Sequence, residues 1–369
     1  MPVYLHAIAT SVPENEYPQV FIREKMKQII GQKRDVSAIL HRVYSQSGID
    51  QRHSVLPDFH EDRSEGKLFL KEGQLHLTPT TGQRNAVYTT EARKLFSETA
   101  RNVIERLGIE RSEITHIITV SCTGFYAPGP DYTTLIDLGL PLSTPRFHIG
   151  FMGCYAVFPA LRMAKAICES DPKANVLIVS VELCTLHLQF SEEIDAILGA
   201  SVFGDGASAA IVSAREPKHG HLLRLDEMFT TLAPEGESDM AWTIGDQGFE
   251  MVLTSYVPKI LEMRIDAAIA PLLEQAGLEK EKVDIWAVHP GGRAIIDKVR
   301  EGLGAREEQV EVSRNVLQRV GNLSSATILF VLEQLLYKRA NSEEQSVVAM
   351  AFGPGLTIES GAFTLQKRA

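Results

Sequence analysis

Cys154 has the sequence context in this chain that most clearly suggests chemistry. It lies in GFMGCYAVF (150–158), after a glycine and directly before a predicted helix rich in alanine, leucine and methionine. Free backbone N–H groups and the helix dipole at a helix N-terminus stabilise a thiolate, and Gly153 permits the sharp turn that would present the sulfur. The pattern predicts a nucleophile, with a buried structural cysteine as the alternative.

A thiolate nucleophile needs a group that accepts and returns protons, and His289 is the strongest candidate among the eleven histidines. It ends the apolar segment VDIWAV and precedes the turn PGG, so a strand end would hold the imidazole beside loop space. His187, in CTLHLQF, follows another apolar segment and is the second candidate. The alternative for each is a histidine that only satisfies hydrogen bonds at a strand end.

Segments of the chain repeat at one fixed offset, the one that separates Gly108 from Gly277. Each of these glycines stops a predicted helix, and a charged turn and a buried strand follow both of them. Further pairs in the same register are 151–167 with 320–336 and 175–182 with 344–351. Three pairs at one offset predict two related halves of the chain.

Asn322, in VGNLSSA, corresponds through this repeat to Gly153, the neighbour of Cys154. An uncharged amide near His289 could polarise a thioester carbonyl as a hydrogen-bond donor. An ordinary helix N-cap is the alternative, because asparagine fills that position well. The repeat register favours the functional interpretation.

Each half alternates strands and helices, which predicts an α/β protein with buried, mainly parallel sheets covered by helices. We expect an N-terminal half over 1–220 that carries the cysteine and a C-terminal half over 221–369 that carries His289 and Asn322. The first hundred residues are more irregular, with helices predicted around 20–30 and 90–107. A duplicated α/β arrangement is the organisation of the thiolase fold, and one large doubly wound sheet is the alternative.

Two glycine-rich turns follow or precede apolar strands. AFGPGLTIE (351–359) contains Gly353 and Pro354 in a tight turn that could approach a ligand closely, and FGDGASAAIV (203–212) leads into a strand. Plain connecting turns are the alternative. Neither segment is a phosphate-binding loop, because GxxxxGK[ST] and GxGxxG are absent from the sequence.

Composition limits the class of protein further. The net charge of −10 over 369 residues argues against a general nucleic-acid binder. The four cysteines contain no CxxC pair, so neither a zinc site nor a dense disulfide framework is predicted. No basic, apolar leader starts the chain and no apolar run reaches about 18 residues, so we expect a cytoplasmic protein without a membrane segment.

As an ordered set, these motifs resemble type III polyketide synthases of the chalcone-synthase-like kind. The matching segments are GFMGCYA, VFGDGA, AVHPGGRAIID, VGNLSSATILF and FGPGLTIE, and the resemblance covers roughly residues 100–365. It implies a homodimeric acyltransferase of thiolase fold that uses acyl-CoA and malonyl-CoA, without a metal or a bound organic cofactor. Cys154 would carry the acyl group, while His289 and Asn322 would stabilise the enolate formed by decarboxylation. His289 is also expected to keep Cys154 ionised, with a lowered pKa.

The same resemblance assigns residues of the substrate cavity, several of which depart from the plant pattern. Phe203 matches a gatekeeper phenylalanine, whereas Met251 stands where the second gatekeeper is usually aromatic. Trp242 replaces a glycine, Cys122 replaces a threonine, and Ala127 replaces a methionine that reaches the partner subunit. Further residues that the resemblance assigns to the cavity or to the CoA tunnel are His187, Ser324 and Arg42.

Because of these departures, the product cannot be transferred from plant enzymes, and a fatty acyl starter with a pyrone or resorcinol product is the expectation. The nearest alternative is an initiating β-ketoacyl synthase that uses an acyl carrier protein. A hydroxymethylglutaryl-CoA-synthase-like enzyme is less favoured, because its catalytic acid has no evident counterpart here. An inactive thiolase-fold binding or scaffold protein is the alternative of another class.

Overall fold

A nine-stranded sheet runs through the computed structural model, which describes residues 1–60, 62–217, 220–339 and 343–368. The strand order is β13-β14-β15-β10-β1-β9-β8-β6-β7. These strands are β1 (Val3–Ser11), β6 (His116–Ser121), β7 (Arg146–Gly150), β8 (Asn175–Leu183), β9 (Asp205–Ser213), β10 (Gly220–Leu232), β13 (Ile285–Val288), β14 (Gln345–Gly353) and β15 (Thr357–Arg368). Three two-stranded ribbons accompany the sheet: β2 (Asn15–Pro18) with β3 (Gln51–Ser54), β4 (Leu70–Lys71) with β5 (Gln74–Leu75), and β11 (Met240–Gly245) with β12 (Gly248–Leu253).

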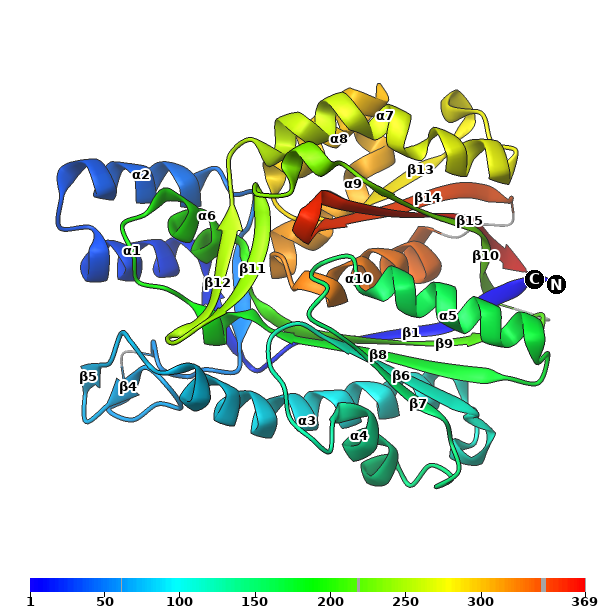
Figure 1. The fold of residues 1–369 in the computed structure, drawn as a ribbon, viewed down its shortest axis with the longest axis horizontal. Coiled ribbons are helices and arrows are strands. Elements are labelled where there is room, and N and C mark those ends of the chain that lie inside the picture. The colour runs from blue at the N-terminus through cyan, green and yellow to red at the C-terminus, as the bar shows by residue number, and fades with distance from the viewer. Residues whose placement is uncertain (61, 218–219, 340–342, 369) are drawn as a thin grey trace.

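The sheet bends so that its two halves enclose a central layer of two helices (Figure 1). This layer consists of α5 (Val157–Ser170) and α10 (Thr327–Gln334). Outer helices cover the far faces: α3 (Thr81–Leu107) and α4 (Pro130–Leu138) on one side, and α7 (Val257–Ala276), α8 (Arg293–Leu303) and α9 (Glu307–Val320) on the other. The hairpin of α1 (Gln19–Ile30) and α2 (Arg34–Ser45) lies at one end beside α6 (Ile194–Val202).

The sheet is mixed. Pairing is parallel at its two ends, between β13 and β14 and along β8, β6 and β7, and antiparallel through its middle. The α/β thiolase-like fold predicted from the sequence is confirmed, but most pairs of the described sheet are antiparallel where mainly parallel pairing was predicted. The reason is that each half ends in an antiparallel pair, β8 with β9 and β14 with β15, and the halves join through antiparallel β1 and β10. The parallel strands are those next to the predicted reactive segments. A parallel pair needs a crossover, and the crossovers here are α4, α5 and the run of α8, α9 and α10.

The duplication predicted from the sequence is visible in the element boundaries. β6 begins at His116 and β13 at Ile285, which is the same offset as that between Gly108 and Gly277. α5 and α10 occupy corresponding places, and so do β8 and β14. Gly108 and Gly277 both adopt the left-handed conformation after a helix, with φ of 68° and 64°, as the C-terminal signals predicted.

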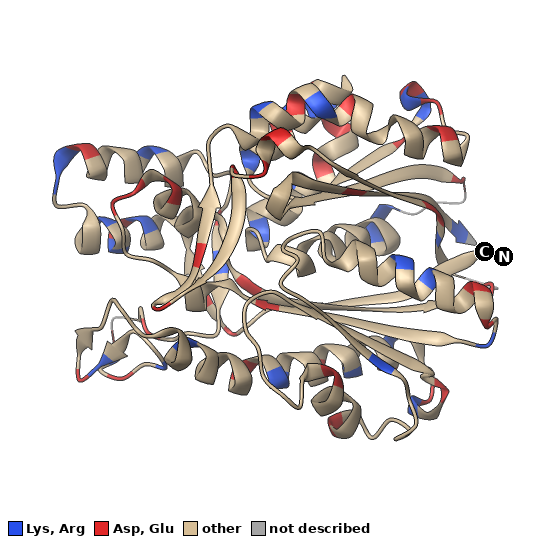
Figure 2. Ribbon diagram, in the orientation of Figure 1, with Lys and Arg blue, Asp and Glu red and all other residues tan. Residues whose placement is uncertain are grey.

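One large apolar cluster lies in the enclosed layer, and two more lie between the sheet and the outer helices. Side chains of α5 and α10 form one continuous buried cluster with strands from both halves of the sheet. Charged side chains are concentrated on the outer helices and loops, and few lie on the strands (Figure 2). This distribution explains the long apolar runs in the sequence, because β8 and β9 are buried along their whole length.

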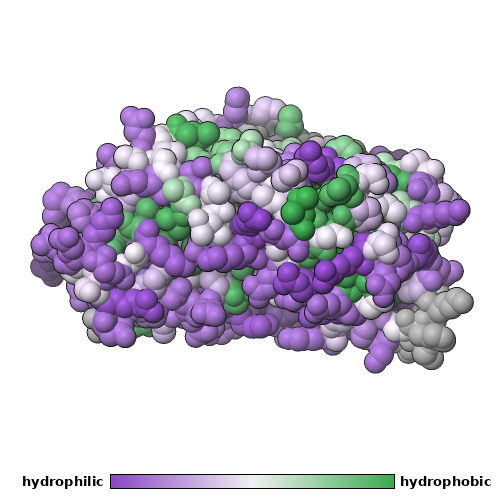
Figure 3. All heavy atoms as spheres, turned by 90° about the horizontal axis from the view of Figure 1, so that it is seen from below, coloured by the Kyte–Doolittle hydropathy of each residue, from purple (hydrophilic) through white to green (hydrophobic). Residues whose placement is uncertain are grey.

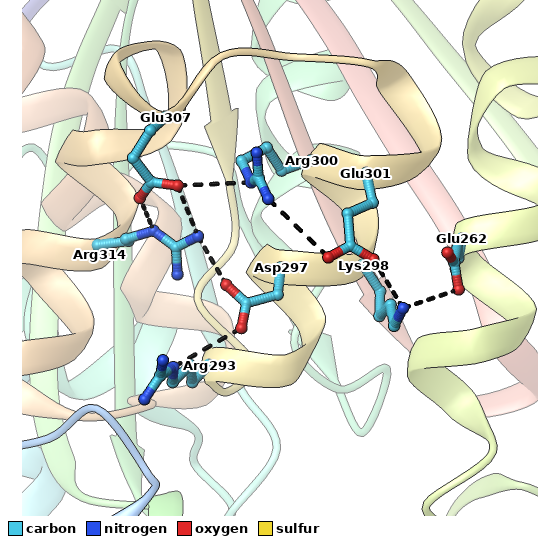
Figure 4. Close-up of polar contacts among 8 residues, drawn as sticks. All are labelled: Glu262, Arg293, Asp297, Lys298, Arg300, Glu301, Glu307 and Arg314. Atoms are coloured by element: carbon cyan, nitrogen blue, oxygen red, sulfur yellow. Dashed lines mark hydrogen bonds and ion pairs between the residues drawn. The ribbon is translucent and has the colours of Figure 1, made fainter.

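Ion pairs link the outer helices α7, α8 and α9 (Figure 4). Arg314 of α9 pairs with Asp297 of α8 at 2.6 Å, and Lys298 of α8 pairs with Glu262 of α7 at 3.2 Å. Exposed pairs of this kind each contribute about 0.2–1 kcal/mol. These pairs connect α8, which begins four residues after His289, to α7 and α9. Within the described ranges, no helix is long and apolar enough to cross a membrane.

Candidate active site

Cys154 lies in a turn that begins three residues before α5, close to the helix start that the sequence predicted. Gly153 has φ of +84°, and a Cβ atom placed on it would lie 2.3 Å from Cδ of Pro354. Only glycine fits such a position without displacing its neighbour. The side chain of Cys154 is half-buried, and its Sγ lies 3.6 Å from Oγ of Ser324.

His289 and Asn322 come from the second half of the chain. His289 follows β13, its backbone N–H donates to Met350 in β14 at 2.8 Å, and its side chain is 1% exposed. Neither ring nitrogen has a hydrogen-bond partner among the described residues. An imidazole without internal partners is free to exchange a proton with a bound thioester or thiol.

The contacts of Asn322 test the two roles considered from the sequence, a helix N-cap and a hydrogen-bond donor. Its Oδ1 accepts the backbone N–H of Ser324 at 2.8 Å, at the first residue of the short 3₁₀ turn ahead of α10, although Leu323 and not Asn322 is the N-cap residue. Its Nδ2 donates to the carbonyl of Gly291 at 3.3 Å, within the turn that follows His289. Because Nδ2 has a second hydrogen to donate, the amide could still offer a donor to a substrate oxygen.

A cavity of about 420 Å³ brings the predicted residues together. Its walls include the three predicted catalytic residues Cys154, His289 and Asn322, and the predicted substrate-contacting residues Phe203, Met251, Trp242, Cys122, His187, Ser324, Gly353 and Pro354. Arg42, the remaining prediction, is exposed on α2 and does not line the cavity. The lining is predominantly apolar, which suits an acyl chain more than a polar metabolite.

An aromatic wall closes one side of the cavity. His187 stacks on Phe249 with ring centres 4.1 Å apart, and Trp242 meets both rings edge-on at 5.8 Å. Nδ1 of His187 accepts the N–H of Phe249, so Nε2 carries the proton and donates to the carbonyl of Thr123 at 2.8 Å. Burial lowers the pKa of His187 to about 4. A neutral histidine fixed in this way serves the wall and is not available as a base.

Trp242 is held in this wall by its indole Nε1, which donates to the carbonyl of Cys122 at 3.0 Å. Trp242 and His187 were predicted as cavity residues, but Phe249 was not. Phe249, which stacks on His187, belongs to β12 and lies far from His187 along the chain. The wall occupies space that a glycine at position 242 would leave open.

The pKa of Cys154 differs from the expectation that it is lowered. Burial raises the pKa of the Cys154 thiol to about 12, and the nearby Glu182 carboxylate acts in the same direction. Burial also lowers the pKa of His289 to about 3, so its imidazole is neutral and gives the sulfur no charge stabilisation. The expectation that His289 and the helix terminus lower the pKa of Cys154 is therefore wrong for the free enzyme. In the free enzyme these shifts favour the neutral thiol of Cys154 and the neutral imidazole of His289.

Glu182, at the end of β8, is a buried acid that the sequence did not single out. Its carboxylate accepts the backbone N–H of Cys122 at 3.0 Å and the hydroxyls of Thr123 and Ser325. Burial raises the pKa of Glu182 to about 7. Since Ser325 belongs to the Asn322 turn and Cys122 contacts Gly153, this carboxyl joins the two halves of the site.

The cavity has an arm that reaches helix α1, which the sequence did not predict. We define this arm by the residues of β2, α1 and α6 that line the cavity: Tyr17 of β2, Phe21, Ile22, Met26 and Ile29 of α1, and Ala196, Gly199 and Ala200 of α6. The sequence predicted a helix around 20–30, but nothing in the sequence indicated which surface that helix covers. Lys25 also lines this arm, while Ser191, Glu193 and Asp195 contribute polar groups near the start of α6.

Fold and site together place a cysteine, a histidine and an asparagine in one apolar cavity, an arrangement suited to a condensing enzyme. Comparison with known proteins identifies the family: residues 2–217 match the N-terminal domain and residues 224–365 the C-terminal domain of chalcone and stilbene synthases. The chain belongs to this family, the type III polyketide synthases, which are acyltransferases that condense CoA thioesters.

Solved structures of type III polyketide synthases are similar to this chain over its whole length. PKS-I from the brown alga Ectocarpus siliculosus has 27% identity and a TM-score of 0.91, with 100% of this chain and 98% of that chain covered. The 1,3,6,8-tetrahydroxynaphthalene synthase from Streptomyces coelicolor A3(2) has 26% identity and a TM-score of 0.87, with 99% of each chain covered. The type III domain of Steely1 from Dictyostelium, at 24% identity, shares the fold with a TM-score of 0.90 and full coverage of both chains. None of the three alternatives considered from the sequence is favoured by these matches.

Proposed function

We propose that this enzyme loads an acyl-CoA with a long apolar tail onto Cys154, extends it with malonyl-CoA, and cyclises the chain to a pyrone or resorcinol-type product. The observation that supports this most is the convergence of Cys154, His289 and Asn322 on one apolar cavity. The CoA thioesters are the only small molecules the reaction requires, and no organic cofactor or metal takes part.

The proposed reaction has two half-reactions, loading of the acyl group and its extension, in which Cys154, His289 and Asn322 have different roles. In loading, Sγ of Cys154 attacks the acyl carbonyl and passes its proton to neutral His289, which returns it to the departing CoA thiolate. In extension, malonyl-CoA loses carbon dioxide and leaves an enolate, whose oxygen faces donors on His289 and Asn322. The enolate carbon then attacks the thioester on Cys154, which releases the sulfur and forms a β-ketoacyl-CoA.

The arm between α1 and α6 is the proposed site of the starter's tail. It opens from the same cavity as Cys154, and aliphatic and aromatic side chains line it on the α1 side. The aromatic wall of Trp242, His187 and Phe249 blocks the opposite direction. Burying each methylene of a tail in the arm contributes about 0.8 kcal/mol, so longer acyl groups should bind more tightly until the arm is full.

An acyl-CoA series tests this proposal. Purified enzyme is incubated with malonyl-CoA and saturated acyl-CoAs of increasing length, and products are read by mass spectrometry. A Cβ on Gly199 would meet only Sδ of Met251 at 3.9 Å, so Gly199→Leu should fold and narrow the arm. The preferred starter should shift to shorter chains in Gly199→Leu, while Ala38→Leu, at an exposed position of α2, should have no effect. An unchanged length preference would reject the arm as the acyl site.

We further propose a cytoplasmic homodimer with its interface at strand β7. β7 is an edge strand of the sheet, and Arg146, Phe147 and His148 on it are exposed. The chain between β6 and β7, which includes α4, carries further exposed apolar side chains: Phe125, Tyr132, Ile136 and Leu142. Hydrophobic clusters of this kind interrupt the mostly hydrophilic face near α3 and α4 (Figure 3). A second copy of the chain could cover both the unpaired backbone groups of this edge strand and the exposed apolar side chains. Light scattering would show the dimer as twice the mass of the chain.

The boundary between the two halves is also a proposal, with one half at 1–220 and the other at 221–369. The internal repeat supports it, because every repeated element of the first half lies before position 220.

A further inference from the structure

Arg52 of β3 is an arginine buried in the cavity wall, at the C-terminal end of α6. Its side chain is 6% exposed. Nη1 donates to the carbonyl oxygens of Ala200 at 2.8 Å and Phe203 at 2.6 Å, and Nε donates to Oε1 of Gln19 at 3.0 Å. One guanidinium group thus connects the start of α1 with the gate residue Phe203.

The carbonyl groups at the end of α6 all have partners outside the helix. A helix leaves its last carbonyls without intrahelical donors. Besides the two that bind Arg52, the carbonyl of Ser201 accepts Nε2 of Gln19 at 2.7 Å, and that of Val202 accepts the N–H of Asn322 at 2.9 Å. The position of this helix end therefore depends on Arg52, Gln19 and Asn322.

The same cluster includes the loop of Asn322. The carbonyl of Asn322 accepts the N–H of Gly204 at 2.9 Å, so Asn322 is hydrogen bonded on both sides of Phe203. Gly321 has φ of +72°, and a Cβ on it would lie 3.0 Å from Cγ of Arg52. Arg52 thus packs directly against the turn that presents the Asn322 amide.

The charge of Arg52 is stabilised by dipoles and by two nearby acidic groups, the Tyr44 phenol and the Asp205 carboxyl, which both raise its pKa. Its hydrogen bonds go to neutral oxygens, and the negative end of the α6 dipole faces the guanidinium. Burial lowers the pKa of Arg52, although it stays charged at neutral pH. The planar guanidinium directs its donors at fixed angles, which a lysine cannot reproduce.

We propose that Arg52 is a positioning residue for the condensation step, holding Phe203 and the Asn322 turn in register with Cys154. This inference rests on the proposed function. A rigid register lets the enolate reach the acyl thioester before water protonates it to acetyl-CoA. When the register loosens, decarboxylation continues while condensation fails, because carbon–carbon bond formation is the more demanding of distance and angle.

The variants Arg52→Met and Arg52→Lys test the proposal. With malonyl-CoA and an acyl-CoA, the acetyl-CoA released and the polyketide formed are quantified together, and acyl loading on Cys154 is followed by intact-protein mass. Acetyl-CoA released per condensation should rise about 10-fold or more in both variants, with loading unchanged. Arg111→Met is the matched control, because Arg111 donates to the carbonyl of Leu138 at the end of α4, away from the cavity.

Hydrogen exchange gives a readout that does not depend on turnover. The amides of Gly204 and Asn322 should exchange about 10-fold faster in Arg52→Met but not in Arg111→Met. If Arg52→Met does not fold, Gln19→Met removes the bonds to Ser201 and Arg52 and should show the same pattern more weakly. The inference would be overturned if folded Arg52→Lys or Gln19→Met released no more acetyl-CoA per condensation than wild type and exchanged the amides of Gly204 and Asn322 at the wild-type rate. If the wild-type enzyme formed no polyketide, the proposed function would be rejected. Hydrogen exchange at Gly204 and Asn322 would still show whether Arg52 positions this turn.

Discussion

Gly153 and Pro354 are packed so closely that a Cβ atom on Gly153 would lie 2.3 Å from Cδ of the proline. Gly153 precedes Cys154, and Pro354 belongs to the turn between β14 and β15 in the other half of the chain. The turn that presents the sulfur is thus set by contact between the two repeats. Duplication produces a site in which each half limits the conformation of the other.

Gly153→Ala should displace Cys154 and destabilise the protein. The left-handed conformation alone costs a non-glycine residue about 1–3 kcal/mol, and the clash with the proline ring adds to it. We expect loss of polyketide formation and a lower melting temperature. Gly108→Ala is the control, because Gly108 also has positive φ but no atom lies within 4 Å of the place that an added methyl would take. This change should cost only about 1 kcal/mol and keep activity.

Alkylation of Cys154 in the free enzyme should be slow at neutral pH. A pKa raised to about 12 keeps the thiol protonated, and the thiolate fraction then grows tenfold with each pH unit. The iodoacetamide rate, measured by peptide mass, should rise without a plateau from pH 7 to 10. Cys154→Ala supplies the background from the other cysteines. A plateau below pH 8 would show that the thiolate is stabilised and that His289 is charged beside it.

Glu182 should make the protein less stable as pH rises from about 4.5 to 7. Its pKa is about 7 in the folded state and near 4.3 in the unfolded chain, so the folded state binds the proton more tightly in this window. The free energy of unfolding should fall by about 3 kcal/mol across it and then level off. Glu182→Gln removes this contribution, so the difference between the two unfolding curves, measured in urea at each pH, isolates it. Parallel curves would contradict the assignment.

Trp242→Ala should lengthen the product. Removing the indole opens the aromatic wall beside His187 and leaves space for additional two-carbon units, which mass spectrometry would detect. Trp242→Phe keeps a ring in the wall and loses only the bond to the Cys122 carbonyl, worth about 1 kcal/mol. It should therefore retain the original product length. Identical products from all three proteins would show that the wall does not limit extension.

The sequence was sufficient to predict the fold because its signals are local and repeated. The helix stops at Gly108 and Gly277 and the apolar runs of β8 and β14 carry the register of the repeat in their own residue types. That register also made Asn322 the counterpart of Gly153, the residue before Cys154.

Contacts between distant segments could not be predicted in this way. The important contacts of Arg52, Glu182 and Phe249 are with residues far away in the sequence. The periodicity of the sequence carries no information about such contacts. The pKa of Cys154 was misjudged for a related reason. Sequence position indicates a nearby helix, whereas the depth of burial, which dominates here, emerges only from the packed structure.

The most direct test of the account separates the two half-reactions. Wild type, Cys154→Ala and Asn322→Ala are each given malonyl-CoA and a long-chain acyl-CoA, and acyl-enzyme, acetyl-CoA and polyketide are measured by mass spectrometry. Cys154→Ala should form neither acyl-enzyme nor polyketide yet still release acetyl-CoA, whereas Asn322→Ala should become acylated but decarboxylate at least about 100-fold more slowly. Polyketide formation by Cys154→Ala, or normal decarboxylation by Asn322→Ala, would contradict the central claim.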